Sequence, residues 1–200
     1  MTENIQEEQH GHKNREDYWT QWVKENGPED IARKLTELEH NSEHDGLTGL
    51  LNRRGLEERI LSTALAVVRR NSGLSFLFID MDGLKTLNDS KGHDKGDEAI
   101  EQVAKAIQLR GNDIPGRWGG DEFLIILPDT GQEEALLIVD RIKDNLKGAL
   151  TTVSIGVGMW DGEKDPLEII NEADRSMNEF KHAGLADGER SKGIDVITLE

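Results

Sequence analysis

The chain has 200 residues, which fits one domain plus an extension and allows a sizeable core. Its formal net charge of −16 argues against general binding to nucleic-acid polymers or anionic membranes, because both need clustered Lys and Arg. The absence of cysteine excludes disulfides and zinc–thiolate sites. No apolar run is long enough to span a membrane and no signal-peptide pattern opens the chain, so we expect a cytoplasmic protein.

Residues 1–44 differ from the rest, with eleven acidic residues against five Lys and Arg. The first fifteen or so are polar and predicted to be disordered. Aromatic residues follow at Tyr18, Trp19 and Trp22, and Pro28 is placed to begin a helix with Ile31, Leu35 and Leu38 on one face. This helix would either pack on the main domain or form a stalk that pairs two protomers. We expect an N-terminal extension over 1–44 and one main domain over 45–200.

Helical and strand patterns alternate after Asp45. Apolar residues at helical spacing predict helices over 54–70, 97–109, 133–146 and 167–182. Nearly continuous apolar runs predict buried strands over 74–79, 123–127 and 153–159, and a closing strand over 194–199. This alternation predicts an α/β fold in which helices flank a mixed sheet.

Acidic residues stand at the ends of two predicted strands. The first strand ends in Asp80-Met81-Asp82, and the second is preceded by Gly119-Gly120 and begins at Asp121 and Glu122. Consecutive residues of a regular strand point to opposite sides, so we expect Asp121 to face Asp80 and Glu122 to face away. The glycines are placed at a predicted hairpin, where they allow positive φ and the close approach of a ligand. Carboxylates converging from neighbouring strands suit a two-metal phosphoryl-transfer site.

The stretch NDSKGHDKGDEA follows at 88–99. Gly92 and Gly96 predict a loop, after which Asp97 begins a helix and is either its N-cap or an acceptor for guanine N–H groups. Asn88 would add a donor and an acceptor to such a base-binding site. Lys85 is either a phosphate ligand or an ordinary solvated lysine.

Taken together, these stretches resemble the GGDEF family of diguanylate cyclases. The resemblance covers essentially residues 45–200 and is carried by HDGLTGLLNRRG at 44–55, FIDMDGLKTLNDSKGHDKGD at 78–97, RWGGDEF at 117–123, TVSIGVG at 152–158 and FKHAG at 180–184. It implies a palm-like α/β domain of the nucleotidyl cyclase or ferredoxin-like type. It also implies condensation of two GTP into cyclic di-GMP and two pyrophosphates, within a face-to-face homodimer whose protomers each bring one GTP.

The resemblance also implies roles for individual residues. Mg²⁺ (or Mn²⁺) would be held by Asp80, Asp121 and the Met81 carbonyl, and Glu122 would act at the metal or at the attacking hydroxyl. The guanine would be bound by Asn88 and Asp97. The phosphates would be held by Lys85, Lys181 and the backbone amides around Gly83 and Leu84. Gly120 would let the nucleotide lie against the hairpin.

A second, inhibitory site is implied by an RxxD motif a few residues before the two glycines. Arg110 and Asp113 match this motif, which in many family members binds product dimers. Arginine can grip a phosphate or a guanine edge, and aspartate can accept from guanine N–H groups. The alternative is a helix-end arginine beside a turn aspartate.

Some positions depart from the family pattern. Leu185 stands where the family often has an arginine that contacts the triphosphate, and Arg190 would have to supply that contact instead. Asn178 replaces a tyrosine, and Gly83-Leu84 replaces a frequent aromatic pair. Two alternatives to an active cyclase therefore remain. One is a catalytically weak module that senses GTP or cyclic di-GMP, and the other is a cyclase with a hybrid product, which the acid at Asp97 disfavours.

Overall fold

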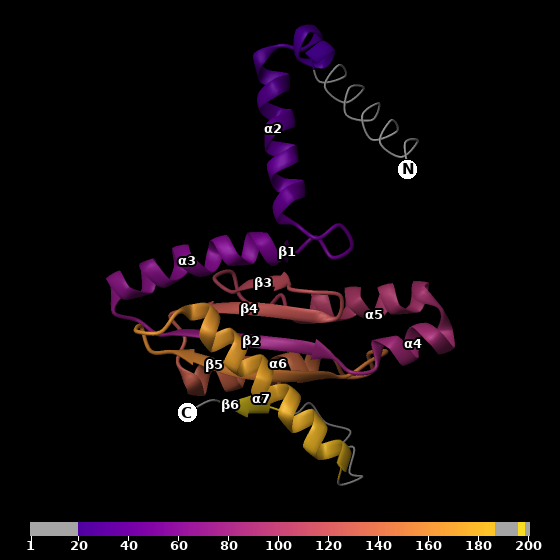
Figure 1. Ribbon diagram of the computed structural model, residues 1–200, viewed down its shortest axis with the longest axis vertical. Helices are drawn as coiled ribbons and strands as arrows, with labels where there is room; N and C mark the ends of the chain where they lie inside the picture. Colours follow the sequence, from indigo (N-terminus) through magenta and orange to yellow (C-terminus); the bar gives the residue numbers. More distant parts are fainter. Residues whose placement is uncertain (1–19, 187–195, 199–200) are drawn as a thin grey trace, which may run out of the picture. The chain divides into compact units, whose positions relative to one another are not determined.

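A computed structural model describes residues 20–186 and 196–198, apart from the side chains of 35–41, 180–186 and 196–198 (Figure 1). The chain divides into two compact units, Met1–Ser42 and Glu43–Glu200. Helix α2 (Pro28–Glu43) begins at Pro28, as the sequence predicts. Tyr18 and Trp19, and the side chains of Leu35 and Leu38, lie outside the described part. Within that part, no helix combines the length and apolar character that crossing a membrane requires.

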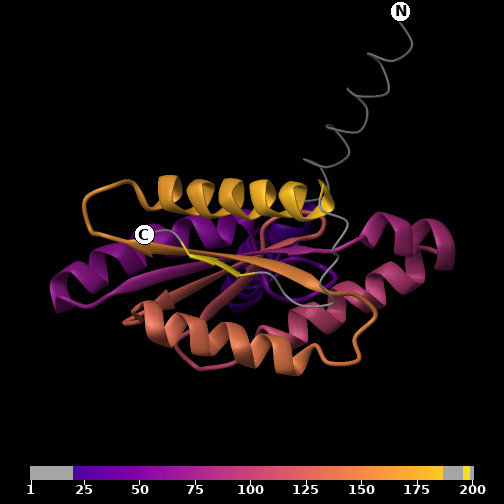
Figure 2. The same ribbon diagram turned by 90° about the horizontal axis from the view of Figure 1, so that it is seen from below.

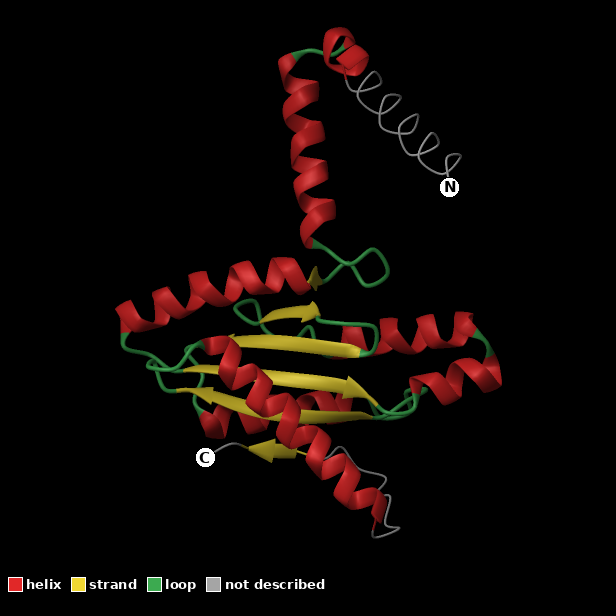
Figure 3. Cartoon of the chain, in the orientation of Figure 1, coloured by secondary structure: helices red, strands yellow, loops and turns green. Residues whose placement is uncertain are grey.

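A mixed sheet forms the centre of the second unit, as predicted (Figure 3). Within the described residues it has six strands in the order β1-β3-β4-β2-β5-β6. Their bounds are β1 (Leu51–Asn52), β2 (Leu74–Met81), β3 (Ile114–Arg117), β4 (Glu122–Pro128), β5 (Val153–Trp160) and β6 (Val196–Thr198). Strand β2 pairs antiparallel with both β4 and β5, β3 pairs antiparallel with β4, and the two outermost pairs are parallel. The central strand is therefore β2, which ends in the predicted site.

Helices cover both faces of this sheet. They are α3 (Arg53–Arg70), α4 (Leu84–Lys91), α5 (His93–Ala106), α6 (Gln132–Asn145) and α7 (Pro166–Ala186). Figure 2 shows α3 and α7 on one face and α5 and α6 on the other. Phe76 and Phe78 of β2 pack toward α3 and α7, while Leu77 and Ile79 belong to the core beneath α5 and α6. Because both faces of β2 are covered, its sequence is a continuous apolar run.

Glycines in β5 bring α7 directly onto the sheet. A Cβ at Gly156 would lie 2.5 Å from the carbonyl oxygen of Ala173, and one at Gly158 would lie 2.7 Å from Ile169 Cγ2. Neither distance leaves room for a side chain, so the glycines of TVSIGVG are needed for the packing of α7. This close approach places the first half of α7 directly against β5.

Around residues 83–97 the structure contains one helix that was not predicted and one helix that begins earlier than predicted. The segment after β2 forms α4, which was not predicted because Leu84 is its one buried residue. Helix α5 begins at His93 with Gly92 at its N-cap, whereas the sequence analysis placed its start at Asp97. Asp97 is therefore inside the helix and is not its N-cap. Two interpretations of this residue remain: a ligand for guanine, or an ordinary solvated acid.

Candidate functional site at the acidic end of the central strands

Asp80 lies directly opposite Glu122. The antiparallel register of β2 and β4 pairs these two residues, so their side chains share the sheet face that α3 and α7 cover. The expectation that Asp121 would face Asp80, with Glu122 pointing away, is therefore wrong by one residue. The cause is the register, because a shift of one residue exchanges the two faces of a strand.

Asp121 stands immediately before β4 and remains at the same edge. Its carbonyl oxygen accepts a hydrogen bond from the Met81 backbone N–H, with an N–O distance of 3.0 Å. The turn before it is closed by the backbone N–H groups of Trp118 and Gly119, which both donate to the carbonyl of Glu122 at 2.8 and 3.2 Å. Asp80, Met81, Asp121 and Glu122 thus come together where β2 ends and β4 begins.

The two glycines of the turn serve different purposes. Neither has a positive φ, although glycine would allow one. A Cβ at Gly119 would lie 3.3 Å from the Glu122 Cδ and closer still to its Oε2, so Gly119 leaves room for the Glu122 carboxylate to fold back over the turn. A Cβ at Gly120 would meet no described atom within 4 Å, so the turn is open on that side.

Several negative charges gather at the acidic edge. Burial raises the pKa of the Glu122 carboxyl above its usual value, and the charges of Asp174, Asp121 and Asp80 raise it further. The charge of Arg53 opposes this shift and lowers the pKa. Its guanidinium lies 4.6 Å from the centroid of the Trp118 ring. Charges of one sign that converge on a half-buried carboxylate create a place where a bound cation is favourable.

Asp82 accepts hydrogen bonds from two hydroxyl groups of the protein. Its two carboxylate oxygens accept hydrogen bonds from Thr152 Oγ1 at 2.7 Å and Ser154 Oγ at 2.9 Å. These bonds hold Asp82 toward β5. Of the two acids in the Asp80-Met81-Asp82 stretch, Asp80 is the one that the strand register pairs with Glu122.

The donor set fits a hard divalent cation such as Mg²⁺. Carboxylate oxygens from Asp80 and Asp121, with a nearby backbone carbonyl, are the ligands that such ions take. Among the described residues, no three acidic or histidine side chains converge closely enough to form a complete metal cage. Mg²⁺ commonly binds through one or two carboxylates and completes its shell with water and substrate phosphates. A pair of carboxylates that leaves room for water and phosphate oxygens would suit such an ion.

The start of α4, which follows the acids in the chain, has the features that favour an anion. Gly83 precedes this helix with φ 72° and ψ 25°, and no side chain in the described part of the protein caps it. The first backbone N–H groups of a helix have no intrahelical acceptors, and the helix dipole favours negative charge there. Leu84 and the exposed Lys85 occupy the first turn. Three of the predicted phosphate ligands, Gly83, Leu84 and Lys85, thus follow Asp80 closely in the chain.

The predicted base-binding residues lie on α4 and α5, which fold back on each other at Gly92. Asn88 is half-buried on α4, and Asp97 is exposed on α5. The Oδ1 of Asn88 is buried and finds no hydrogen-bond partner among the described residues. The remaining predicted phosphate ligand, Lys181, belongs to α7, and its side chain lies outside the described part of the structure.

Sequence reasoning assigned no role to Arg117 or Asp45, which hold the turn in place. Arg117 Nη2 donates to the carbonyl oxygen of Gly120 at 2.7 Å, and Nε donates to that of Gly119 at 3.2 Å. Its Nη1 forms an ion pair with Asp45 at 3.2 Å. Burial alone would raise the pKa of the Asp45 carboxyl, but hydrogen bonds from Thr48 and the charge of Arg117 lower it. The HDGLT stretch and the RWGG stretch thus form one clamp on the turn.

Arg110 and Asp113 form the centre of a separate polar network. Arg110 Nε donates to both carboxylate oxygens of Asp113 at 3.0 Å, and the Asp113 side chain is only 1% exposed. Nη2 donates to Thr130 Oγ1 at 3.0 Å, and Nη1 pairs with Glu134. The arginine therefore ties the loop before β3 to the loop before α6. This is more than a helix-end arginine beside a turn aspartate.

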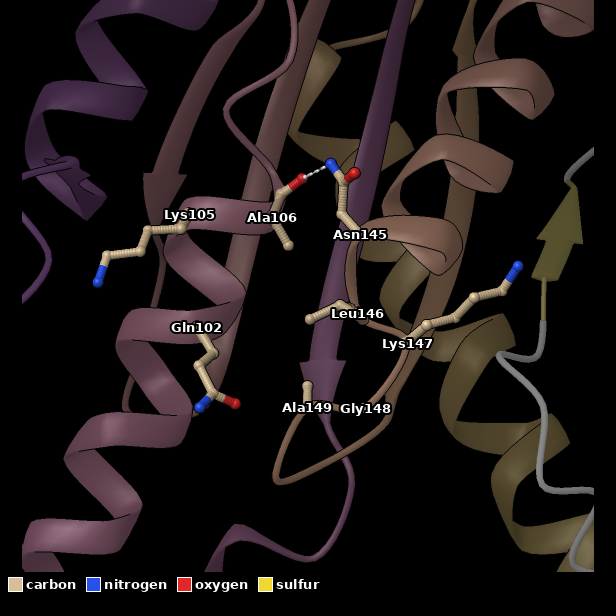
Figure 4. A pocket seen from close by; sticks show the side chains of 8 residues that line it. All are labelled: Gln102, Lys105, Ala106, Asn145, Leu146, Lys147, Gly148 and Ala149. Atoms are coloured by element: carbon tan, nitrogen blue, oxygen red, sulfur yellow. Dashed lines mark hydrogen bonds between the residues drawn. The ribbon is translucent and has the colours of Figure 1, made fainter.

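A hollow of about 420 Å³ lies elsewhere, between the C-terminal ends of α5 and α6 (Figure 4). Its polar groups are engaged in the fold: Asn145 Nδ2 donates to the carbonyl of Ala106 at 3.0 Å, and Gln102 Oε1 accepts from the Leu150 N–H at 3.0 Å. Lys147 is paired with Asp144 at 2.7 Å. The hollow is on the sheet face opposite Asp80 and Glu122, so it is not part of the acidic site.

Known proteins share this sequence and fold. A family model described as diguanylate cyclase, GGDEF domain, matches residues 42–186. The response regulator PleD of Caulobacter vibrioides is 36% identical over 164 residues, which are 74% of this chain and 36% of that protein. The probable diguanylate cyclase DgcC of Escherichia coli is 33% identical over 174 residues, which are 82% of this chain and 47% of that protein. The chain thus spans less than half the length of both relatives.

Solved structures agree with this similarity. Diguanylate cyclase SiaD from Pseudomonas aeruginosa, in complex with its activator SiaC, matches with a TM-score of 0.72 and 28% identity, over 98% of this chain and 76% of that one. A microbial GGDEF domain studied with cyclic di-GMP matches with a TM-score of 0.70 and 31% identity, over 81% of this chain and 99% of that one. Because the family model covers most of the chain, the protein belongs to the GGDEF-domain family of diguanylate cyclases.

Proposed function

We propose that this protein is a diguanylate cyclase, which condenses two GTP into cyclic di-GMP and two pyrophosphates. The observation that carries the proposal is the meeting of Asp80, Asp121 and Glu122 beside the uncapped start of α4, in a member of this family. Carboxylates next to a phosphate-binding helix end are the parts that phosphoryl transfer needs, since that chemistry is mostly positioning and charge neutralisation. The similarity to a GGDEF domain studied with cyclic di-GMP supports the same product.

In this proposal the acidic residues act on the reacting phosphate. Asp80, Asp121 and the Met81 carbonyl would hold Mg²⁺ (or Mn²⁺). When bound, such ions neutralise charge on the phosphates and on the attacking oxygen. The 3′-hydroxyl of each GTP attacks the α-phosphate of the other, so that two phosphodiester bonds form and two pyrophosphates leave. The Glu122 carboxylate, whose pKa is raised, accepts the proton of the attacking hydroxyl.

The remaining residues bind the nucleotide. Asn88 and Asp97 would bind the guanine through its N–H and acceptor groups. The first-turn amides at Gly83 and Leu84 would bind the terminal phosphates, with Lys85 and Lys181 adding charge. Gly120, where a Cβ would meet no described atom, would let the nucleotide lie along the turn. These contacts serve one GTP, so the second GTP must come from another protomer in a face-to-face homodimer.

A product assay across protein concentration tests both the chemistry and the homodimer. Purified protein is incubated with GTP and Mg²⁺, and the products are separated by HPLC with mass detection. We expect cyclic di-GMP and pyrophosphate in a ratio of one to two, with a rate per protomer that rises with protein concentration until the dimer is saturated. Absence of product at high concentration would contradict the proposal and favour a module that senses GTP or cyclic di-GMP. A constant rate per protomer down to the lowest concentration would contradict a dissociable dimer.

We further propose that cyclic di-GMP inhibits the enzyme at Arg110 and Asp113. A product molecule would bind the Arg110 guanidinium, which now contacts Asp113, Thr130 and Glu134. It would also bind the Asp113 carboxylate, which now contacts Arg110. Replacing both partners, Arg110→Ala with Asp113→Ala, is expected to weaken inhibition by cyclic di-GMP more than tenfold. Both are changed together because Arg110→Ala alone would leave the buried Asp113 charge unpaired and destabilise the fold.

The measurement for this site is the concentration of cyclic di-GMP that halves the rate of pyrophosphate release. Arg70→Ala, which breaks an exposed ion pair with Asp129, is the control and should leave that concentration unchanged. Equal inhibition of the double variant and the wild type would mean that the network is purely structural.

A further inference from the structure

The side chain of Asn88 rests against a glycine. Helices α4 and α5 fold back at Gly92, whose N–H donates to the carbonyl oxygen of Asn88 at 2.9 Å. This turn brings Gly96 of α5 against the Asn88 carboxamide. A Cβ at Gly96 would lie 2.9 Å from Asn88 Cγ and 3.3 Å from Nδ2, and closer still to Oδ1. Any side chain at position 96 would therefore displace the carboxamide.

Backbone conformation does not explain the glycine at this position. Gly96 lies inside α5, is buried, and has no positive φ. Glycine lowers helix stability relative to alanine, so on helix propensity alone alanine would be favoured here. The feature that requires glycine is the space that the Asn88 carboxamide occupies.

Packing, rather than hydrogen bonding, holds this carboxamide in place. Asn88 Oδ1 is buried and has no hydrogen-bond partner among the described residues. A buried polar atom without a partner is costly, and such costs are retained mainly at functional sites. The next residue along α5 is Asp97, so the same helix carries both the surface that supports Asn88 and the second predicted guanine ligand.

We propose that Gly96 is a positioning residue for guanine recognition, because its bare Cα sets the place of the Asn88 carboxamide relative to Asp97. This inference rests on the proposed function, since it assumes that Asn88 and Asp97 bind the base. Gly96 itself touches no nucleotide. Its substitution therefore acts through Asn88, and the effect on binding depends on the presence of that side chain.

A double-mutant cycle tests this dependence. Binding of the unreactive analogue guanosine 5′-(α,β-methylene)triphosphate is measured by calorimetry in the presence of Mg²⁺. Gly96→Ala is expected to raise the dissociation constant at least tenfold, while the melting temperature without nucleotide stays the same or rises. In an Asn88→Ala background, Gly96→Ala is expected to change the dissociation constant by less than twofold. In turnover, KM for GTP should rise more than kcat falls.

The matched control is Gly46→Ala, at a glycine where a Cβ meets nothing within 4 Å and φ is not positive. It should leave both the dissociation constant and the melting temperature unchanged. Two results would overturn the proposal: wild-type affinity in Gly96→Ala, or an equal loss with and without Asn88. Because the readout is binding, a wild type that binds the analogue but forms no cyclic di-GMP would refute the cyclase and leave this inference standing.

Discussion

Replacing Asp121 by alanine is expected to abolish cyclic di-GMP synthesis while leaving the protein folded. The side chain is half-buried at the end of a strand and belongs to neither hydrophobic core. Its contribution to the sheet is the carbonyl oxygen that accepts from the Met81 N–H, and alanine retains that group. The loss of a proposed metal ligand removes charge neutralisation at the reacting phosphate. We expect kcat to fall by about a thousandfold or more, equivalent to ~4 kcal/mol of transition-state stabilisation.

The experiment compares turnover and thermal unfolding of the same preparations. Asp121→Asn keeps the size of the side chain and removes only its charge, so it should lose nearly as much activity as Asp121→Ala. Asp144→Ala, an exposed acid at the C-terminal end of α6 paired with Lys147, controls for the loss of any negative charge and should keep wild-type turnover. Retained activity in Asp121→Asn would remove Asp121 from the metal site.

The register of the acidic edge shows where sequence reasoning reached its limit. Continuous apolar runs predicted β2 and β4, and the acids at their ends predicted that carboxylates would meet there. Alternation along one strand does not say which residue of the next strand lies opposite. The structure pairs Asp80 with Glu122 and not with Asp121. This shift of one residue decides which acid lies on the same face of the sheet as Asp80. The residues of the site were thus predictable, whereas their mutual orientation depended on pairing across the sheet.

Short elements and distant contacts were harder to predict for related reasons. Helix α4 buries only Leu84, so it leaves no apolar periodicity to detect, and β1 has two residues. Arg117 and Asp45 are far apart in the sequence, and each is an ordinary polar residue in its own surroundings. No local pattern indicates that they meet. Their contact arises from the parallel pairing of β1 with β3, which sets Asn52 beside Arg117.

The second large effect is expected from Arg117→Ala, because Arg117 both binds Asp45 and holds the turn that carries Asp121. Its guanidinium bonds to the carbonyl oxygens of Gly119 and Gly120, so alanine would leave the turn free to move. A shift of about 1 Å at a reacting group can cost a hundredfold in rate, and we expect kcat to fall between tenfold and a hundredfold. The ion pair is partly exposed, so its loss should lower the free energy of unfolding by about 3 kcal/mol or less.

A lysine at this position separates charge from geometry. Arg117→Lys keeps the positive charge but lacks the planar fork that contacts Asp45 and both carbonyl oxygens. It should recover part of the lost stability and little of the lost kcat. If kcat of Arg117→Ala matches the wild type once the folded fraction is equal, the clamp stabilises the fold without positioning the turn.

The same clamp predicts a dependence of stability on pH through Asp45. Because its pKa is lower in the folded protein than in the unfolded chain, the unfolded chain binds more protons as the pH falls. The stabilisation is therefore complete above the unfolded pKa, about 3.9, and is lost as the pH falls through the folded value. Asp45→Asn should unfold more easily than wild type at pH 7, and the difference should vanish in acid. A difference that persists with the wild-type carboxyl protonated would contradict this account, because the stabilisation by Asp45 would then not depend on its charge.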